Sequence, residues 1–455
     1  MTSAATARTP APAPVPTPIP TEGLSTVTSR ATRVLVLNSG SSSLKYQLLD
    51  MRDNARLAAG LVERIGEETS RLVHTPRPDG GDADGGDADG GDADGGDADG
   101  SGKRERTGPI ADHTEALEAV SAELARDGLG LDSPELAAIG HRVVHGGLKF
   151  TAPTVVDDAV LAEIERLVPV APLHNPANLT GIRTAQRLRP DLPQVAVFDT
   201  AFHTTMPEHA ARYAIDVATA DAHRIRRYGF HGTSHAYVSR KTAELLGREP
   251  ADVNVIVLHL GNGASASAVA GGRCVDTSMG LTPLEGLVMG TRSGDIDPAV
   301  TFHLKRVAGM SVDEIDELLN KKSGLVGLCG DNDMREIRRR VDAGDERARL
   351  AFDIYVHRLK KYIGAYTAVL GRVDAVVFTA GVGENAAPVR EAAVAGLETL
   401  GLAVDAGLNA VRSDKPRIIS PRDARVAVAV VPTDEELEIA QQTFALVDEG
   451  RTVIA

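Results

Sequence analysis

Residues 33–50 read RVLVLNSGSSSLKYQLLD, an apolar run followed by small polar residues and a second, partly apolar run. This pattern predicts two strands joined by a tight turn, which together form a β-hairpin. The turn at 38–45 can direct backbone N–H groups, hydroxyls and one ammonium group toward an anion. It is not a Walker A loop, because its glycine spacing differs and a strand rather than a helix should follow it. Taken alone, it also fits an ordinary serine-rich hairpin turn.

Two more glycine-rich turns follow apolar strands. One, at 259–265, lies between predicted strands over 254–260 and 264–270. The other, at 379–385, follows a predicted strand over 374–379. One such turn is weak evidence, but three turns at strand ends indicate a nucleotide held between two related halves. Together with the helical segments, these strands place the chain in the α/β class with mixed sheets.

Apolar residues at helical spacing predict several helices. They recur at Leu117, Val120 and Leu124, at Val160, Ile164 and Leu167, and over 350–370, and a closing helix is expected over 435–447. His231 and His235 are four residues apart, which could place a metal pair on one helix. Gly232 disfavours a helix at this point, and the glutamate of zinc peptidases is absent between the histidines. We therefore do not expect a metal pair here.

The composition limits the classes of protein to consider. The 455 residues exceed the needs of one hydrophobic core, so two domains are expected. The net charge is −14, and eight of the acidic residues fall within 81–100. No basic stripe indicates nucleic acid, and the apolar runs are too short to cross a bilayer. The two cysteines, Cys274 and Cys329, indicate no disulfide framework and fit the cytoplasm.

Two segments have low complexity. Residues 1–30 alternate proline with small residues and lack a signal-peptide pattern, so we expect a disordered tail. Residues 77–102 repeat Gly-Asp-Ala-Asp and have no large apolar side chain to bury, so we expect a disordered insert. The start of this repeat resembles a calcium loop but lacks its third ligand and closing glutamate, so calcium binding is not expected.

Five further motifs complete the pattern: 140–147, 171–176, 198–203, 228–235 and 289–298. With the three glycine-rich turns interleaved, they resemble the acetokinase family, within the superfamily of acetate and sugar kinases, heat-shock chaperones and actin. The resemblance covers roughly 33–70 and 110–445. It implies a two-domain, duplicated actin-like ATPase fold, which is ribonuclease H-like, with an interdomain cleft that closes on substrate.

The resemblance also implies domain limits and an activity. Domain I would span 31–199 and be completed by a C-terminal helix at 435–455, and domain II would span 200–434 and bind nucleotide. The implied reaction is Mg²⁺-dependent, reversible phosphoryl transfer between ATP and acetate, giving acetyl phosphate and ADP. Mn²⁺ is an alternative metal. The implied assembly is a cytoplasmic homodimer without nucleic-acid or membrane partners.

Two alternatives to this function stay open. A propionate or butyrate kinase would share the motifs, because one methylene changes pocket affinity only modestly. An actin-like filament or chaperone ATPase would share the fold but would need no acceptor-side arginines.

Catalytic roles follow from the resemblance. Arg142 and Arg292 would bind the carboxylate and the transferring phosphate, since a guanidinium holds such oxygens in a forked geometry. Outside the motifs, either arginine could be a surface ion-pair residue. Asp199 and Glu435 would act around Mg²⁺ with Asn38 nearby, although Glu435 also fits a simple first-turn acid of a helix. His231 would donate to the transferring phosphoryl group.

The binding residues are implied in the same way. The acceptor pocket would be lined by Val144, Leu173, Phe230 and Pro283, with Arg142 and His174 contributing polar contacts. The phosphates would contact Ser41, Ser43 and Lys45. The nucleotide would lie along His259, Leu260, Gly261, Asn262, Gly263, Asp333, Met334, Arg335, Gly381, Val382, Gly383, Glu384 and Asn385. Residues 333–335 also fit an ordinary helix start.

Overall fold

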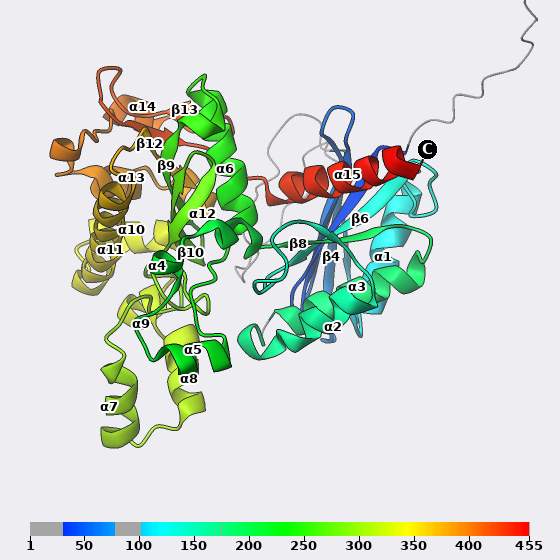
Figure 1. The fold of residues 1–455 in the computed structure, drawn as a ribbon, viewed down its shortest axis with the longest axis horizontal. Coiled ribbons are helices and arrows are strands. Elements are labelled where there is room, and N and C mark those ends of the chain that lie inside the picture. Colours follow the sequence, from blue (N-terminus) through cyan, green and yellow to red (C-terminus); the bar gives the residue numbers. More distant parts are fainter. Residues whose placement is uncertain (1–30, 78–101, 173, 455) are drawn as a thin grey trace, which may run out of the picture.

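The structure, a computed structural model, describes residues 31–77, 102–172 and 174–454. The predicted tail and all but the ends of the predicted insert lie outside the described residues. Figure 1 shows two halves, each built around a twisted sheet with helices packed against it. The two sheets are mixed, as expected for this α/β class.

The first sheet has eight strands in the order β5-β4-β3-β2-β1-β6-β8-β7. Its strands are β1 (Arg33–Ser39), β2 (Leu44–Asp50), β3 (Ala55–Glu63), β4 (Arg71–Pro76), β5 (Arg104–Thr107), β6 (Leu136–Val143), β7 (Thr154–Val155) and β8 (Gln194–Phe198). β1 and β2 pair antiparallel with Arg33 opposite Asp50, which confirms the predicted hairpin. β1, β6 and β8 run parallel, so their carboxyl ends meet at one edge.

The second sheet has six strands in the order β11-β10-β9-β12-β14-β13. Its strands are β9 (Asn254–Leu260), β10 (Ala264–Ala270), β11 (Arg273–Thr277), β12 (Ala375–Thr379), β13 (Arg417–Ile418) and β14 (Ala427–Val430). β9 and β10 form the second predicted hairpin, and β9, β12 and β14 run parallel. The central order therefore repeats that of the first sheet, which confirms the duplicated fold.

Helices cover both sheets and connect the halves. They are α1 (His113–Arg126), α2 (Asp158–Arg166), α3 (Asn175–Leu188), α4 (Glu208–Ala211), α5 (Val217–His223), α6 (Gly232–Leu245), α7 (Ala299–Val307), α8 (Val312–Lys321), α9 (Gly324–Cys329), α10 (Met334–Asp342), α11 (Glu346–Leu370), α12 (Ala380–Asn385), α13 (Ala387–Val394), α14 (Ala406–Ala410) and α15 (Glu435–Ile454). Among the described residues, none of these helices combines the length and apolarity that a bilayer crossing requires.

The last helix joins the first half although it follows the second in sequence. α15 packs on β1, β6 and β8 of the first sheet and also against α6 of the second half (Figure 1). Ile439 and Ala440 are buried with the strand residues of the first sheet. Arg240 on α6 forms an ion pair with Glu438 on α15, so this helix contacts both halves.

The prediction that Gly232 disfavours a helix is wrong, because α6 begins at this residue. Glycine costs little at a first helical position, and here it is required by a close approach. A Cβ on Gly232 would lie 2.1 Å from the carbonyl oxygen of Asp199. The contact depends on the packing of α6 on the end of β8 and has no signal in the local sequence.

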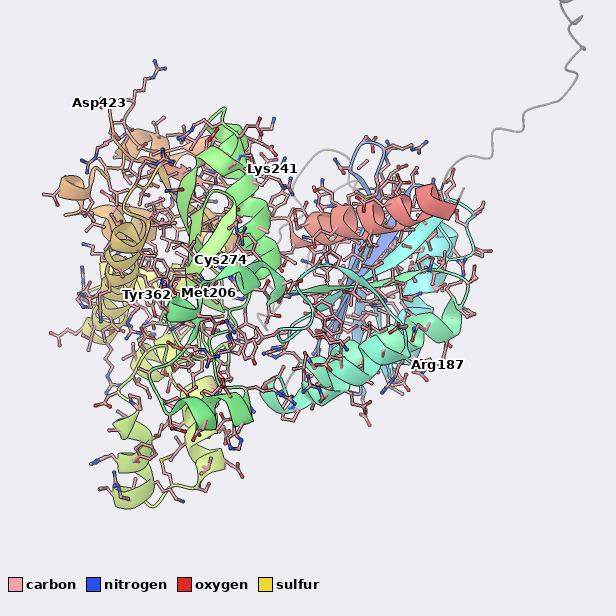
Figure 2. The ribbon with its side chains drawn as sticks, in the orientation of Figure 1. Arg187, Met206, Lys241, Cys274, Tyr362 and Asp423 are labelled. Atoms are coloured by element: carbon pink, nitrogen blue, oxygen red, sulfur yellow. The ribbon has the colours of Figure 1, made fainter. Side chains whose placement is uncertain are left out.

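Both cysteines are buried and free. Cys274 lies beside Met206 within the second half (Figure 2). Its Sγ is 3.1 Å from Nδ1 of His203. Burial raises the pKa of the Cys274 thiol above its ordinary range, which disfavours the reactive thiolate.

Candidate functional site

Arg142 and Asp199 meet where two neighbouring parallel strands end. Arg142 is the penultimate residue of β6, and Asp199 directly follows β8. Nε of Arg142 lies 3.2 and 3.1 Å from the two carboxylate oxygens of Asp199, and Nη2 lies 2.9 Å from Oδ2. Asp199 is 1% exposed and the Arg142 side chain 18% exposed. A buried carboxylate thus fixes a guanidinium that still reaches the solvent-accessible side.

A second carboxylate comes from the first turn of α15. Oε2 of Glu435 lies 3.6 Å from Nη2 of Arg142. The hydroxyl of Thr233 on α6 donates to both Asp199 and Glu435, at 3.4 Å each. The capping of α15 is separate, because the carboxylate of Asp434 accepts from the backbone N–H of Leu437. Both carboxylates therefore face one small volume beside Arg142.

Asn38 lies at the same edge of the first sheet. Leu37 pairs with His141 on β6, so Asn38 is in register next to Arg142. In the described part of the chain, no three His, Cys, Asp or Glu side chains form a metal cluster. Mg²⁺ typically takes only one or two carboxylates beside water and substrate phosphate, so this oxygen-rich edge suits such an ion.

The first glycine-rich turn is held from two sides. The turn is closed by a hydrogen bond from the N–H of Gly40 to the carbonyl of Ser43, and Ser41 is exposed. Nζ of Lys45 lies 2.9 Å from Oε1 of Glu436 on α15. Although burial opposes ionisation of Glu436, Lys45 holds the pKa of that carboxyl below its ordinary value. The lysine is thereby oriented beside the turn.

Asn178 on α3 was missed by sequence reasoning. Its amide N–H donates to the carbonyl of Ser39 at 2.9 Å, and its Oδ1 accepts from the N–H of Val144 at 3.1 Å. The side chain is 3% exposed. It therefore connects the first turn to the segment that follows Arg142. No motif marked it, because its partners are backbone groups distant in sequence.

His231 lies opposite Arg142 at the start of α6. It adopts a left-handed backbone, with φ 56°, and its ring stacks on that of His259 at 4.2 Å. Nδ1 is hydrogen-bonded to the hydroxyl of Ser265 at 2.9 Å, and Nε2 of His235 shares that hydroxyl at 2.7 Å. Burial first, then the neighbouring His259 and Arg142, lowers the pKa of His231 well below its ordinary value. The imidazole is therefore neutral.

Arg292 reaches the same place from the loop after β11. Its Nη1 donates to the carbonyl of Pro283 at 3.2 Å. A Cβ placed on Gly263 would lie 3.5 Å from Nε2 of His231 and 3.6 Å from Nη1 of Arg292. The structure thus brings Arg292, His231 and the second glycine-rich turn together. The bare glycine leaves room for a group between the imidazole and the guanidinium.

The predicted acceptor pocket is described in part. Val144 is 8% exposed and Phe230 2%, and both belong to the apolar core that continues under β9 and β10. Pro283 is half-buried beside Arg292. His174 precedes α3 and is half-buried. Leu173 lies outside the described residues.

The second and third glycine-rich turns are the segments predicted to contact nucleotide. His259 and Leu260 are buried, and Nδ1 of His259 is hydrogen-bonded to the hydroxyl of Ser234 at 2.8 Å. Gly261 donates its N–H to the carbonyl of Gly263. Asn262 accepts from Asn332 at 3.1 Å, which ties this turn to the segment before α10.

The third turn forms α12, with Gly381, Val382, Gly383, Glu384 and Asn385. Oε1 of Glu384 accepts from the N–H groups of Ala380, at 2.8 Å, and Thr433, at 3.2 Å. Burial raises the pKa of Glu384 above its ordinary value. Arg390, which sequence reasoning missed, is 1% exposed and donates to the carbonyls of Gly383 and Glu384.

Residues 333–335 lie at the start of α10. Asp333 caps this helix by accepting from the N–H of Arg335 at 2.8 Å. Met334 is buried, whereas the Arg335 side chain is 92% exposed and pairs with Asp333. The helix-start interpretation of these residues is therefore correct for Asp333, and the nucleotide role stays a prediction.

Comparisons with known proteins agree with this geometry. The profile of the Acetokinase family matches residues 33–87 and 95–441. An acetate kinase of Streptomyces griseus is 82% identical over 92% of this chain and 97% of its own length. One from Nitratidesulfovibrio vulgaris is 52% identical over 90% of this chain and 98% of its own length.

Solved structures give the same result. The acetate kinase of Porphyromonas gingivalis superimposes with a TM-score of 0.82 at 44% identity and covers 92% of this chain and 100% of its own. A propionate kinase of Francisella tularensis superimposes with a TM-score of 0.81 at 41% identity and covers 90% of this chain and 98% of its own.

Proposed function

This chain belongs to the acetokinase family, and we propose that it catalyses reversible phosphoryl transfer between ATP and acetate. The observation that carries the proposal is that Arg142 and Arg292 both act on His231, in a site flanked by glycine-rich turns. Two anions must approach each other in this reaction, and phosphoryl transfer depends mainly on positioning and charge neutralisation. One arginine on each side of His231 supplies that neutralisation.

We assign the binding of the acceptor, acetate, to residues of the first half. Asp199 fixes the guanidinium of Arg142, which we assign to the acetate carboxylate. Asn38, Asp199 and Glu435 are the oxygen donors that would hold Mg²⁺ directly or through water. When bound, the ion neutralises charge on the phosphate oxygens. Lys45, Ser41 and Ser43 would contact these oxygens from the first turn.

We assign the binding of the phosphoryl donor, ATP, to residues of the second half. His231 is neutral, and Ser265 occupies its Nδ1. If the Ser265 hydroxyl donates to Nδ1, the proton of the ring stays on Nε2, which faces the space beside Gly263 and Arg292. A neutral Nε2–H is a hydrogen-bond donor to a transferring phosphoryl oxygen. The adenine and ribose would extend along 259–263 toward 333–335 and 381–385.

A more specific proposal concerns which acid the site prefers. The apolar surfaces of Val144, Phe230 and Pro283 suit a methyl group, yet a solved propionate kinase superimposes almost equally well. Acyl phosphate can be trapped with hydroxylamine, and kcat/KM can be compared for acetate, propionate and butyrate. This experiment tests both the proposed reaction and the preferred acid. A preference for acetate supports acetate kinase, and one for propionate would identify the alternative. ATP hydrolysis unaffected by any acid would instead indicate a filament or chaperone ATPase.

The remaining expectations concern organisation. We propose a cytoplasmic homodimer in which 31–199 with the C-terminal helix forms one domain and 200–434 the other. The projecting α7–α8 hairpin supports a second copy as partner, since no residue of α7 is buried and Phe302 and Val307 are 58% and 72% exposed (Figure 1). Light scattering should give a dimer mass, and Phe302→Glu should lower it. A monomeric wild type would reject this assembly.

A further inference from the structure

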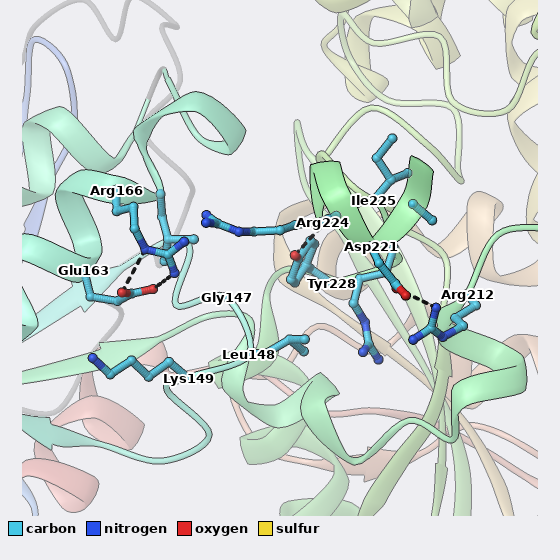
Figure 3. Close-up of a pocket in the computed structure, with 13 residues that line it drawn as sticks. Gly147, Leu148, Lys149, Glu163, Arg166, Arg212, Asp221, Arg224, Ile225 and Tyr228 are labelled. Carbon is cyan, nitrogen blue, oxygen red and sulfur yellow. Dashed lines mark hydrogen bonds and ion pairs between the residues drawn. The ribbon is translucent and has the colours of Figure 1, made fainter. Parts of the chain in front are cut away.

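A cavity of about 470 Å³ lies between the two halves, apart from the arginines of the candidate site. One wall comes from 147–149 and from α2, and the other from the segment 212–228 around α5 (Figure 3). Neither Arg142 nor Arg292 lines it. Cavities of 300–1,000 Å³ are typical of small-molecule sites. This volume is therefore large enough for a ligand of its own.

The lining is strongly basic in an acidic protein. Five cationic side chains line it: Lys149, Arg166, Arg212, Arg224 and Arg226. Only Glu163 and Asp221 oppose them within the lining. Even when Glu208, which pairs with Arg212 and Arg226 from outside, is included, two positive charges remain in excess. The whole chain carries −14, so this excess is local.

Ion pairs leave two of the five cations available, and one of these pairs joins Arg226 to Glu208, which lies outside the lining. Arg166 pairs with Glu163, and Arg212 pairs with Asp221 at 2.8 Å. Lys149 and Arg224 lie in the described part of the chain and have no ion-pair partner there. Lys149 comes from the first half and Arg224 from the second.

The two available cations act on the same volume. In Figure 3 the Arg224 side chain extends across the cavity toward Arg166, and Lys149 lies on the same wall as Glu163. Arg166 first, and then Lys149 and Arg224, hold the pKa of Glu163 below its ordinary value. Three cations from the two halves, Arg166, Lys149 and Arg224, therefore act on the carboxylate of Glu163. That carboxylate is already paired with Arg166.

We propose that this cavity binds a small polyanion carrying at least two carboxylate or phosphate groups, held by Lys149 on one wall and Arg224 on the other. One acidic group would engage the first wall and another the guanidinium of Arg224, whose planar fork suits either chemistry. Such a ligand spans the two halves. Because neither Arg142 nor Arg292 lines the cavity, this site is separate from the one proposed for acetate and nucleotide.

Calorimetry tests the proposal directly. The probes are tricarballylate, a tricarboxylate, and 2,3-bisphosphoglycerate, titrated separately into the full chain with saturating MgADP and acetate, which occupy the candidate catalytic site. The test variant is Lys149→Gln/Arg224→Gln. The matched control is Arg347→Gln/Arg349→Gln, which removes the same charge from exposed positions on α11. Thermal unfolding of each variant verifies folding.

We expect saturable binding of at least one probe to the wild type and to the control, and affinity at least tenfold weaker in the test variant. The probe that binds more tightly identifies the preferred acidic group. Equal affinity in all three proteins would overturn the proposal, as would absence of binding to the wild type. A lowered kcat/KM for acetate in the test variant, without polyanion binding to the wild type, would show an entry path for acetate instead. Binding is measured without turnover, so a failure of the proposed reaction would leave this result interpretable.

Discussion

The two halves of the molecule share one strand order but place different chemistry at equivalent positions. β1, β2, β6 and β8 correspond to β9, β10, β12 and β14, with the same parallel and antiparallel relations. The end of β6 carries Arg142, fixed by a buried carboxylate. The end of β12 carries small residues and Glu384, which accepts from backbone N–H groups. Duplication supplies the framework, and the residues at the strand ends supply the function.

The hairpin turns differ in the same way. The turn after β1 is followed by Lys45, which is paired with Glu436, a charged contact to the closing helix. The turn after β9 is held by neutral groups, with Asn262 and Asn332 joined by a hydrogen bond. The first half therefore orients its groups through charges and the second mainly through neutral hydrogen bonds. Substitutions in each half can test this contrast.

The largest effect should come from removing one arginine from each half. We expect Arg142→Ala and Arg292→Ala each to lower kcat by roughly 10³–10⁵, the range for charge-stabilising arginines in phosphoryl transfer. Arg347→Ala, an exposed arginine on α11, should leave kcat unchanged. Acetyl phosphate formation and circular dichroism measure activity and folding. A folded Arg142→Ala or Arg292→Ala variant with near wild-type kcat would contradict the role assigned to that arginine in binding the acceptor or the donor.

A smaller loss should follow from removing the neutral group that orients His231. Ser265→Ala deletes the hydroxyl shared by His231 and His235, and misplacement of one reacting group can cost about 10²-fold in rate. Ser267→Ala is the matched control, because Ser267 is equally buried on β10 but bonds to Thr277. Its kcat should stay near that of the wild type. Equal kcat losses in both variants would indicate general damage to β10.

Stability should fall in acid because both halves bury neutral histidines. Burial lowers the pKa of His141 in the first half and of His203 in the second half to about 4. Between this value and the unfolded value of about 6.5, the unfolded chain binds more protons, so lowering the pH favours unfolding. We expect each of these two histidines to reduce the free energy of unfolding by about 2 kcal/mol from pH 7 to pH 5.

Urea titrations over this pH range measure how the free energy of unfolding changes with pH. His141→Gln should make this dependence shallower than in the wild type, whereas His357→Gln, at an exposed position on α11, should not. A wild-type stability that is flat from pH 7 to pH 5 would contradict the burial argument.

The sequence predicts the framework far better than the contacts within the site. The hairpins at 33–50 and 254–270 follow from local apolar runs and turn residues, so their prediction needed no tertiary information. The arginines came from motif resemblance. Asn178 and Ser265 act through partners distant in sequence, and the helix at Gly232 depends on the nearby carbonyl of Asp199. Such contacts have no local pattern.

The smallest expected effect tests whether the apolar end of the first half contacts substrate. Val144 follows Arg142 by two residues and is 8% exposed, packed in the core cluster that includes Phe230. If it contacts the methyl group of the acid, Val144→Ala should shift the preference from acetate toward propionate by roughly 1–3 kcal/mol per methylene. The shift should lie mainly in KM, because Arg142, Asp199 and Arg292 are untouched.

The alternative is that Val144 only supports the core. Loss of two methyl groups would then lower stability and reduce activity on all acids alike, since a buried cavity weakens packing without favouring a longer substrate. The propionate-to-acetate ratio of kcat/KM and the melting temperature separate these cases. A lowered melting temperature with an unchanged ratio would remove Val144 from the pocket. A changed ratio would show that the first half sets acceptor size as well as acceptor charge, because the residue that contacts the methyl group lies on the same strand end as the arginine that binds the carboxylate.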